Sequence, residues 1–417
     1  MKSYLVGGAV RDQLLNIASK DKDWVVVGGT PQKMLALGYK QVGADFPVFL
    51  HPKTQQEYAL ARTERKQGQG YQGFAVHFSD DVTLEEDLIR RDLTINAMAQ
   101  CADGTLIDPF NGQQDLHNKQ LRHVSPAFSE DPLRVLRVAR FAARFHHLGF
   151  SIAPETLQLM QNMSRSGELS HLTAERVWVE TERALQEESP WIYFSVLKQC
   201  AALAVCFPEL DALFGVPQPK QHHPEIDTGR HSLMVLEQAS LLSTEPVVRF
   251  AALLHDLGKA LTPQENWPKH IKHEVLGLAP INEMCDRLRI PNVFRELSLK
   301  TCEFHTQVHR AFELKAGTIW KLLRRCDALR KPQRFHDMLS ACMADSRGRT
   351  GFENIEYPQA AYLTALLAAA MAVPVKELVA QGLQGAALGQ AIEQARIQAI
   401  SHALPQLKCQ HMDQYET

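Results

Sequence analysis

The chain lacks most signs of an exported or membrane-bound protein. Among its 417 residues no run of about 18 apolar residues is evident, and the first 20 residues lack the apolar core of a signal peptide. The eight cysteines are scattered and form no C-x-x-C pair, which argues against a disulfide framework and a cysteine-based zinc site. We therefore expect a cytoplasmic protein with reduced thiols and no membrane contact.

An excess of basic residues is also missing. The formal net charge is −2, whereas domains that bind nucleic acid often carry a basic bias. Any contact with nucleic acid must then come from local patches. The clearest is residues 321–334, where Arg324, Arg325, Arg330 and Lys331 outnumber Asp327. A solvated helix face explains this patch equally well.

The most informative stretch lies near the N-terminus. Gly7 and Gly8 follow a strand-like start and precede a helical pattern that carries Arg11. Glycines at such a turn let backbone N–H groups approach an anion closely. Asp21 and Asp23 lie two residues apart before an apolar run, so that both carboxylates point to one face if the run is a strand. Two carboxylates on one face suit Mg²⁺ and phosphoryl transfer.

The pattern of the chain changes after about residue 125. Before that point, strand-like runs alternate with turns and helices; the runs are residues 3–6, 24–27, 48–50, 57–61, 75–78 and 105–107. From about residue 129 the periodicity is helical nearly to the end. We predict an α+β fold in which an N-terminal mixed β-sheet with helices is followed by all-α regions. The expected parts are residues 1–125, 126–220, 221–330 and 331–417.

Two further sequence motifs are rich in charged residues. The first is R-R-D-L-T-I-N-A-M over residues 90–98. The second opens a predicted helix with Glu130, Asp131 and Pro132, and Ser129 can cap that helix. Arginines then recur every three residues at 134, 137 and 140, a row that slants around the helix and could follow an elongated ligand. Salt bridges on a solvated face are the alternative.

Taken in order, these motifs resemble the class II tRNA nucleotidyltransferase and poly(A) polymerase branch of the DNA polymerase β superfamily. Leu93 stands where that family usually has Phe. The resemblance implies that Asp21 and Asp23 are catalytic and hold Mg²⁺, and that the triphosphate of ATP or CTP is bound by Gly8, Arg11, Arg91, Arg137 and Arg140. Residues 66–73 correspond to the flexible loop of the family, and Glu64 is a possible third carboxylate ligand.

The resemblance assigns the choice of nucleobase to Asp131 and Arg134. Cytosine and adenine both present an amino donor beside a ring acceptor. A carboxylate acceptor and a guanidinium donor match both edges, whereas the keto edges of uracil and guanine would face the carboxylate without a donor.

A second site is predicted in the middle of the chain. His255 and Asp256 are adjacent in H-D-L-G-K, and His231 lies 24 residues earlier. A lone His-Asp pair is usually structural, but this combination resembles the HD phosphohydrolases. Imidazole nitrogen and carboxylate oxygen suit a divalent transition metal, and Ni²⁺ is one candidate. Asp327 and Asp345 are both candidates for the last carboxylate, and His273 and His305 could line the same pocket.

Together the motifs imply a CCA-adding tRNA nucleotidyltransferase with an HD domain that acts on 2′,3′-cyclic phosphates, 2′-nucleotides or phosphomonoesters. Its partners would be tRNA, ATP and CTP, and it would act as a monomer or homodimer. One alternative is a bacterial poly(A) polymerase, which the HD segment and the apolar, Ala-rich tail disfavour. The other is an HD hydrolase with an inactive head, which the intact carboxylates and arginines disfavour.

Overall fold

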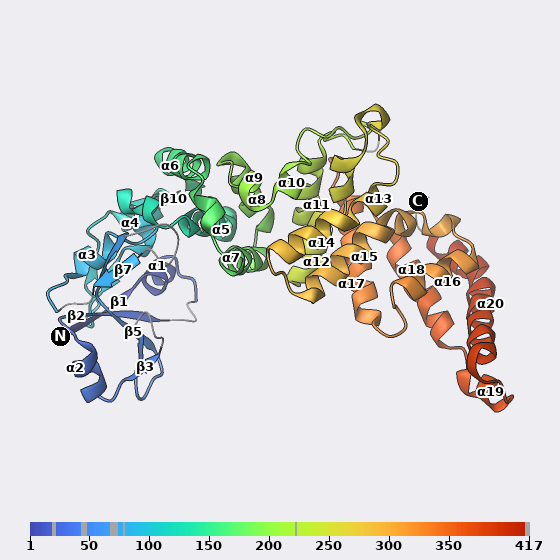
Figure 1. The fold of residues 1–417 in the computed structure, drawn as a ribbon, viewed down its shortest axis with the longest axis horizontal. Helices are drawn as coiled ribbons and strands as arrows, with labels where there is room; N and C mark the ends of the chain where they lie inside the picture. The colour runs from blue at the N-terminus through green and yellow to red at the C-terminus, as the bar shows by residue number, and fades with distance from the viewer. Residues whose placement is uncertain (19–21, 43–47, 67–73, 78–79, 222, 413–417) are drawn as a thin grey trace. The chain divides into compact units, whose positions relative to one another are not determined.

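The computed structural model describes residues 1–18, 22–42, 48–66, 74–77, 80–221 and 223–412, with the side chains of residues 63–79 and 412 left out. The chain forms two compact units, Met1–Cys206 and Phe207–Thr417 (Figure 1). Every described strand lies in the first unit, and the second is helical. The predicted α+β fold class is therefore confirmed. The division into four parts is finer than these two units and stays a prediction.

A seven-stranded mixed sheet builds the head of the first unit. Its strand order is β3-β4-β5-β2-β1-β8-β9, and neighbouring strands are antiparallel except for the parallel pair β2 and β5. The strands are β1 (Lys2–Val6), β2 (Asp23–Val27), β3 (Lys40–Val42), β4 (Val48–Leu50), β5 (Glu57–Leu60), β8 (Ala99–Gln100) and β9 (Leu106–Ile107). Two small pairs stand apart: β6 (Thr63–Lys66) with β7 (Phe74–His77), and β10 (Gln120–Leu121) with β11 (Ser151–Ile152).

The six predicted strand runs all coincide with strands, although Phe78 lies outside the described residues. The sequence reading missed β3, β6, β8, β10 and β11. These strands are two to four residues long and mostly polar, so they show neither alternation nor an apolar run.

Both faces of the central strands are buried. Val25 belongs to a cluster that contains Val6 and Ala99, whereas the next residue, Val26, packs with Phe49 and Leu60. Successive side chains of a strand point to opposite faces of the sheet. Because both faces of this strand are buried, its apolar residues form the continuous run at residues 24–27 instead of alternating with polar residues.

Helices complete the first unit, and α5 positions the predicted arginine row. This helix packs against α7 and α8 through buried residues that include Val135, Leu136 and Ala139. Ser129 does not cap it: the Ser129 hydroxyl donates to the Pro126 carbonyl, and Asp131 Oδ1 accepts from the Leu133 N–H instead. The helices are α1 (Gly8–Leu14), α2 (Pro31–Ala36), α3 (Leu84–Leu88), α4 (Gly112–His117), α5 (Leu133–Phe145), α6 (Pro154–Arg165), α7 (Ala174–Gln186), α8 (Pro190–Gln199) and α9 (Leu203–Cys206).

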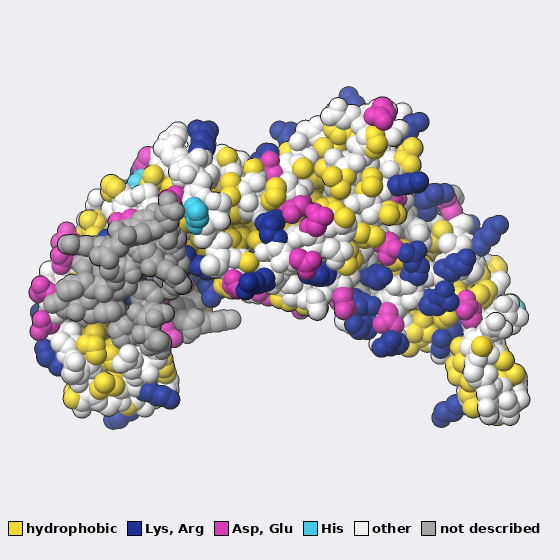
Figure 2. Space-filling view, in the orientation of Figure 1, with side chains coloured by type: hydrophobic (Ala, Val, Ile, Leu, Met, Phe, Trp, Pro, Cys, Tyr) yellow, Lys and Arg dark blue, Asp and Glu magenta, His cyan; other side chains and the backbone are white. Residues whose placement is uncertain are grey.

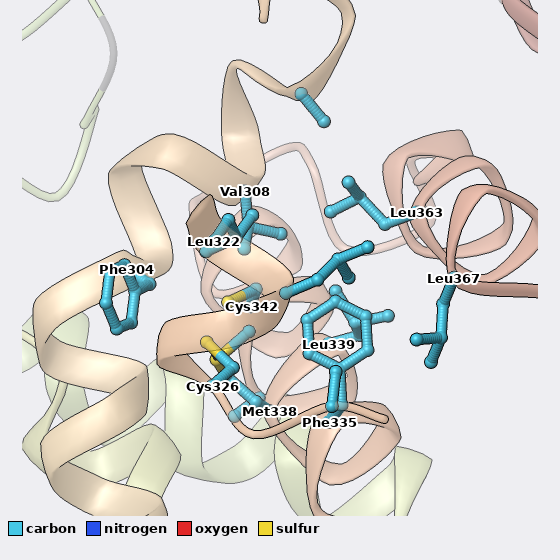
Figure 3. Close-up of a cluster of buried hydrophobic side chains, with 14 of the residues drawn as sticks. Phe304, Val308, Leu322, Cys326, Phe335, Met338, Leu339, Cys342, Leu363 and Leu367 are labelled. Carbon is cyan, nitrogen blue, oxygen red and sulfur yellow. Dashed lines mark hydrogen bonds between the residues drawn. The ribbon is translucent and has the colours of Figure 1, made fainter. Parts of the chain in front are cut away.

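The second unit is built around one large apolar cluster. Figure 3 shows side chains from several helices meeting there, among them Phe304, Leu322, Leu339 and Leu363. The helices of this unit are α10 (Pro208–Asp211), α11 (Thr228–Leu242), α12 (Pro246–Leu254), α13 (His273–Leu276), α14 (Leu278–Arg287), α15 (Asn292–His309), α16 (Ala316–Arg325), α17 (Pro332–Arg347), α18 (Pro358–Met371), α19 (Val375–Ala380) and α20 (Gly385–Met412).

One helical segment meets the length and hydropathy criteria for a membrane span, although no such run was evident in the sequence. Residues Pro358–Ala380 are long and apolar enough to cross a membrane, with a mean hydropathy of 1.7 in the best window. Its first part is α18, which packs against α20 and buries Leu363, Leu366 and Leu367 in the apolar cluster. One face of α18 therefore packs in the core of the second unit, although only 22% of that window is buried.

All eight cysteines are free thiols, as expected from their spacing. Six of them are buried, which suits small apolar side chains of a core.

Candidate nucleotide and metal sites

The pairing of β1 and β2 brings the first two motifs together. Asp23 opens β2 and lies opposite Val6, the residue directly before Gly7 and Gly8. Asp23 therefore lies at the same edge of the sheet as the glycine turn. Asp21 lies outside the described residues, as do residues 67–73 of the predicted flexible loop, and the side chain of Glu64 is among those left out.

The glycine turn makes room for two arginines. Gly7 has a φ of 70°, and a Cβ atom there would lie 2.8 Å from Nη1 of Arg91. A Cβ on Gly8 would lie 3.3 Å from Nη2 of Arg11. Arg91 is held by Asp87, whose Oδ2 lies 3.2 Å from Nη2 of Arg91. The positive φ favours glycine at Gly7, and at both positions the guanidinium groups pack directly onto the backbone.

Arg11 is buried and fixed on all sides. Its Nε donates to Asp12 Oδ1 at 2.8 Å, and its Nη1 donates to Asn96 Oδ1 at 2.5 Å. The rings of Phe141 and Phe145 lie 5.2 and 5.0 Å from its guanidinium carbon. Burial lowers the pKa of Arg11, and Asp12 opposes that shift.

A cavity of about 1070 Å³ opens in front of these residues. Both glycines and Asp23 contribute to its wall, and the charged lining contains five aspartates. Nine arginines outnumber them: Arg11, Arg62, Arg90, Arg91, Arg134, Arg137, Arg140, Arg144 and Arg176. A cavity with this excess of guanidinium groups suits a polyanion such as a triphosphate.

The two residues expected to select the base both have protein partners. Asp131 follows the 3₁₀ helix η3 (Pro126–Glu130), and its carboxylate pairs with Nη2 of Arg176 at 2.9 Å. Arg134 donates from Nη1 to the Ala127 carbonyl and from Nη2 to the Arg90 carbonyl, each at 2.6 Å. These contacts hold the orientation of both side chains at the cavity wall.

The rest of the arginine row takes part in an ion-pair network. Arg137 donates from Nε to Asp92 Oδ2 at 2.8 Å, and Arg140 donates from Nε to Glu180 Oε2 at 2.7 Å. Four residues after Arg140, Arg144 pairs with Asp12 at 3.0 Å.

The sequence analysis did not identify Arg144 and Arg176 as residues of the cavity wall. Extending the row by one helical turn would have found Arg144. Arg176 lies on α7, more than 40 residues beyond Asp131, and belongs to none of the motifs identified in the sequence.

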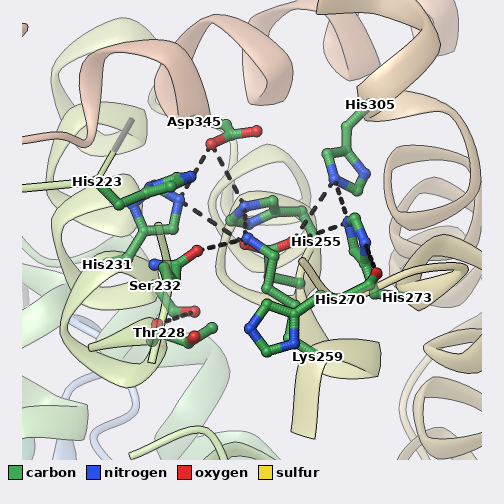
Figure 4. Close-up of polar contacts among 12 residues, drawn as sticks. His223, Thr228, His231, Ser232, His255, Lys259, His270, His273, His305 and Asp345 are labelled. Carbon is green, nitrogen blue, oxygen red and sulfur yellow. Dashed lines mark hydrogen bonds and ion pairs between the residues drawn. The ribbon is translucent and has the colours of Figure 1, made fainter. Parts of the chain in front are cut away.

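The second site gathers five residues from four segments of the second unit. His231 lies on α11, His255 ends α12, and Asp256 precedes the 3₁₀ helix η6 (Leu257–Leu261). His305 lies on α15, and Asp345 lies on α17. All five side chains are buried (Figure 4).

The geometry brings Asp345, and not Asp327, to the histidines. Asp345 Oδ1 lies 3.1 Å from His231 Nε2 and 3.4 Å from His255 Nε2. Asp327 instead pairs with Arg330 and Arg334, and among the described residues no contact joins it to these histidines. Distance along the chain cannot separate the two candidates, because only the packing of α17 on α11 brings Asp345 to His231.

The chemistry of this cluster fits a divalent transition metal. Asp256 Oδ1 has no hydrogen-bond partner among the described residues, whereas Asp256 Oδ2 lies 2.6 Å from Lys259 Nζ and 3.0 Å from His255 Nε2. Buried polar groups without such partners are rare and costly. The donor set of imidazole nitrogen and carboxylate oxygen is the one that such metals prefer.

Buried charges set the protonation of the cluster. Burial lowers the pKa of His305 to about 3, although Asp256 opposes that shift, so its ring is neutral. Burial also disfavours the charged form of His255, but Asp256 and Asp345 outweigh it and raise the pKa of His255 to about 10. Without a metal, the His255 ring is therefore charged and carries a proton on Nε2 as well as on Nδ1. A bound metal would replace the proton on Nε2.

The basic patch at residues 321–334 is largely paired with acids. Arg324 contacts Glu393 at 3.3 Å, Lys331 contacts Glu296 at 3.1 Å, and Arg325 pairs with Glu303. Figure 2 shows basic and acidic side chains interspersed over this part of the visible face. These pairs favour a solvated helix face over a strong site for nucleic acid.

Three family models match the chain. They are the Poly A polymerase head domain at residues 3–122, the probable RNA and SrmB-binding site of polymerase A at residues 149–214, and the HD domain at residues 228–333. The matched HD range ends before Asp345.

Curated relatives match nearly the whole chain. The multifunctional CCA protein of Hahella chejuensis is 62% identical over 400 residues, which is 96% of this chain and 95% of that protein. The multifunctional CCA protein of Haemophilus influenzae is 59% identical over 406 residues, 96% of this chain and 98% of that protein.

Solved structures share the fold at lower identity. The Thermotoga maritima CCA-adding enzyme complexed with tRNA has a TM-score of 0.63 at 20% identity, covering 97% of this chain and 90% of that one. The Bacillus stearothermophilus CCA-adding enzyme in complex with CTP has a TM-score of 0.62 at 22% identity, covering 99% and 94%.

The head fold and the helical domain that carries the His–Asp cluster define the class: a nucleotidyltransferase with a poly(A) polymerase head domain and an HD domain. Within that class, identities of 59% and 62% over almost the full length show that the chain belongs to the multifunctional CCA protein family. The family predicted from the motifs is thereby confirmed.

Proposed function

We propose that this protein adds C, C and A to the 3′ end of tRNA without a template, using CTP and ATP, and that its HD domain hydrolyses phosphate esters. Membership of the multifunctional CCA protein family supports both activities. The observation that carries the first is the arginine-lined cavity with Asp23 at its wall. The scattered free thiols fit a cytoplasmic protein.

The head residues have different roles in nucleotide transfer. Asp23, together with Asp21, would hold Mg²⁺, which when bound supplies charge stabilisation for phosphoryl transfer. Arg91, packed on Gly7, is placed to neutralise triphosphate oxygens. Arg11 is already enclosed by Asp12 and Asn96, so its part is to fix the wall of the cavity.

Asp131 and Arg134 supply the acceptor and the donor for the base edge. Arg176 and two backbone carbonyls hold them in place before any nucleotide arrives. A pair held in this way discriminates by leaving a buried polar group unpaired when the wrong base enters.

The test uses tRNA that lacks its 3′ end, with labelled CTP and ATP and Mg²⁺. Ordered addition of C, C and A followed by a stop supports the proposal. A long A tract identifies a poly(A) polymerase, and no addition identifies an inactive head. Asp23→Asn is expected to abolish addition, because it removes a charged oxygen ligand at the wall of the cavity.

The HD activity is tested separately. The purified protein is incubated with 2′,3′-cyclic AMP, 2′-AMP or p-nitrophenyl phosphate in the presence of Ni²⁺, Co²⁺ or Mg²⁺. We expect hydrolysis with a transition metal and its loss in His255→Gln, because His255 Nε2 is a buried ligand candidate. Inactivity on all three substrates would contradict this part of the proposal. Size-exclusion chromatography with light scattering distinguishes the monomer from the homodimer.

A further inference from the structure

The two carboxylate oxygens of Asp345 have different partners. Its Oδ1 lies 3.1 Å from His231 Nε2 and 3.4 Å from His255 Nε2, and Figure 4 shows it turned toward these two rings. Its Oδ2 lies 2.6 Å from Nε2 of His309, the last residue of α15. One oxygen of this buried carboxylate therefore faces the candidate metal site, while a histidine that belongs to no sequence motif holds the other.

The chemistry of the two groups fixes the direction of this hydrogen bond. A carboxylate accepts, so Nε2 of His309 carries the proton and donates to Asp345. On the other side of the ring, Nδ1 of His309 lies 2.8 Å from the Tyr357 hydroxyl, which can either donate or accept. Both ring nitrogens of His309 are thus engaged, and the chain of contacts runs from Tyr357 through His309 to Asp345.

This orientation separates His309 from the histidines that face the metal site. Nδ1 of His231 has two acceptors, the Gly348 carbonyl at 2.9 Å and Glu225 Oε1 at 3.0 Å, and Nδ1 of His255 also lies 2.8 Å from a backbone carbonyl. Protonation at Nδ1 leaves Nε2 of these rings to serve as a metal ligand. His309 instead turns an N–H toward the site, so it supports the carboxylate and does not itself bind the ion.

The segment that follows α17 holds this arrangement in place. A Cβ on Gly348 would lie 2.5 Å from Cγ2 of Val235, so this backbone packs directly on α11. Tyr357, which precedes α18, is only 7% exposed, and Gln359 Nε2 donates to the His309 carbonyl at 3.3 Å. The matched HD range ends at residue 333. Residues beyond that range therefore contact both the metal-site histidines and the histidine behind Asp345.

We propose that His309, held by Tyr357, is a positioning residue of the HD site: it engages Oδ2 of Asp345 so that Oδ1 alone binds the metal ion. This inference rests on the proposed hydrolase, whose metal His231 and His255 would share with Asp345. Partners behind a metal ligand fix its orientation and strengthen binding. Neither His309 nor Tyr357 needs to touch the substrate for this role.

Cobalt binding tests the role of His309 without an activity assay. The full chain carrying Asp21→Asn and Asp23→Asn, which removes the head as a metal site, is stripped with a chelator and titrated with Co²⁺. The titration gives the affinity, and the visible absorption of bound Co²⁺ reports the geometry of its ligands. His309→Met should weaken binding about 10–100-fold and alter the spectrum, because the Asp345 carboxylate is then free to rotate.

The conservative variant His309→Gln separates a hydrogen bond from packing. Its side-chain amide still carries an N–H donor for Asp345 Oδ2, whereas methionine has a side chain of suitable bulk without a donor. We expect His309→Gln to restore the affinity and the spectrum of the parent chain. If His309 only filled space, the methionine variant would bind Co²⁺ at least as well as the glutamine variant.

A pair of tyrosine variants provides a second measurement. Tyr357→Phe removes only the hydroxyl that contacts His309, and we expect a weaker affinity for Co²⁺ with a smaller loss than in His309→Met. Tyr362→Phe is the matched control in α18, because the buried Tyr362 hydroxyl has no hydrogen-bond partner among the described residues. It should bind Co²⁺ like the parent chain. Circular dichroism shows which variants are folded, and the tyrosine pair decides if His309→Met is not.

The outcomes distinguish this inference from the proposed hydrolase. Equal affinity in the parent chain, His309→Met and Tyr357→Phe overturns the positioning role, and so does a glutamine variant that binds no better than the methionine variant. A parent chain that binds no Co²⁺ overturns both proposals. Binding with the expected effects of the variants, but without hydrolysis of any substrate, overturns the hydrolase alone.

Discussion

Asp92 is a single buried residue that connects several parts of the head by hydrogen bonds. Its Oδ1 accepts from the Leu93 N–H and from Asn96 Nδ2, and its Oδ2 accepts from Arg137 Nε. Burial favours the neutral acid, but Arg137 and Asn96 outweigh burial and hold the pKa of Asp92 well below its ordinary value. Such a carboxylate stabilises the fold at any pH above its unfolded pKa.

We predict that Asp92→Asn destabilises the first unit by roughly 1–3 kcal/mol at neutral pH, because it removes the nearer of the two carboxylates that contact Arg137. The penalty should shrink as the pH falls below about 4, since the wild-type contribution is lost as Asp92 protonates. Urea unfolding read by hydrogen exchange of peptides from α5 measures both effects.

Asp80→Asn provides the control for this measurement. Asp80 pairs with Lys33 at 3.7 Å, but its side chain is 60% exposed. An exposed pair contributes about 1 kcal/mol or less. Equal destabilisation by both variants would contradict the role given to Asp92.

At the scale of elements, close backbone packing sets the position of α13. A Cβ on Gly258 in η6 would lie 1.9 Å from the His273 carbonyl oxygen and 2.5 Å from the Gly277 nitrogen. Backbone atoms cannot move aside as a flexible side chain can. The glycine of H-D-L-G-K therefore lets α13 pack beside Asp256 and bring His273 to it.

We predict that Gly258→Ala displaces α13 and lowers the HD hydrolase activity about 10²-fold, the loss expected from a misplacement of about 1 Å. Hydrogen exchange over residues 270–277 should rise. Gly317→Ala in α16 is the control, because a Cβ there meets nothing within 4 Å and alanine favours a helix. Unchanged activity in Gly258→Ala would show that α13 is not needed at the site.

The apolar helix α18 is another element whose role depends on its packing. Leu366 is fully buried in the apolar cluster of the second unit, so Leu366→Ala should destabilise that unit by about 2–5 kcal/mol. Leu241→Ala, at a leucine that is 73% exposed, should change stability by less than about 0.5 kcal/mol. Thermal unfolding monitored by hydrogen exchange of the second unit measures the difference. A small effect at Leu366 would mean that α18 is not held in the core.

At the scale of the whole molecule, the two units carry two chemically different candidate metal sites. Asp23 offers carboxylate oxygen in the first unit, whereas the second offers mainly imidazole nitrogen. Mg²⁺ prefers oxygen ligands, and transition metals accept nitrogen. The two activities should therefore differ in the metal that they need.

We predict that a chelated protein resupplied with Mg²⁺ alone regains nucleotide addition but little of the hydrolase. Adding Ni²⁺ or Co²⁺ should restore the hydrolase. Parallel assays on one preparation, with tRNA and with 2′,3′-cyclic AMP, provide the comparison. Equal recovery of both activities with Mg²⁺ would contradict the difference in donor sets.

The sequence by itself determined the family, the α+β class and the candidate residues of both sites, because each depends on short motifs or on local periodicity. Runs such as residues 24–27 and 48–50 became strands since their apolar side chains had to be buried wherever the sheet formed. The tertiary structure alone chose Asp345 over Asp327, added Arg144 and Arg176 to the cavity wall, and set His273 against His305. Those contacts join segments 32 to 132 residues apart, and only packing brings such segments together.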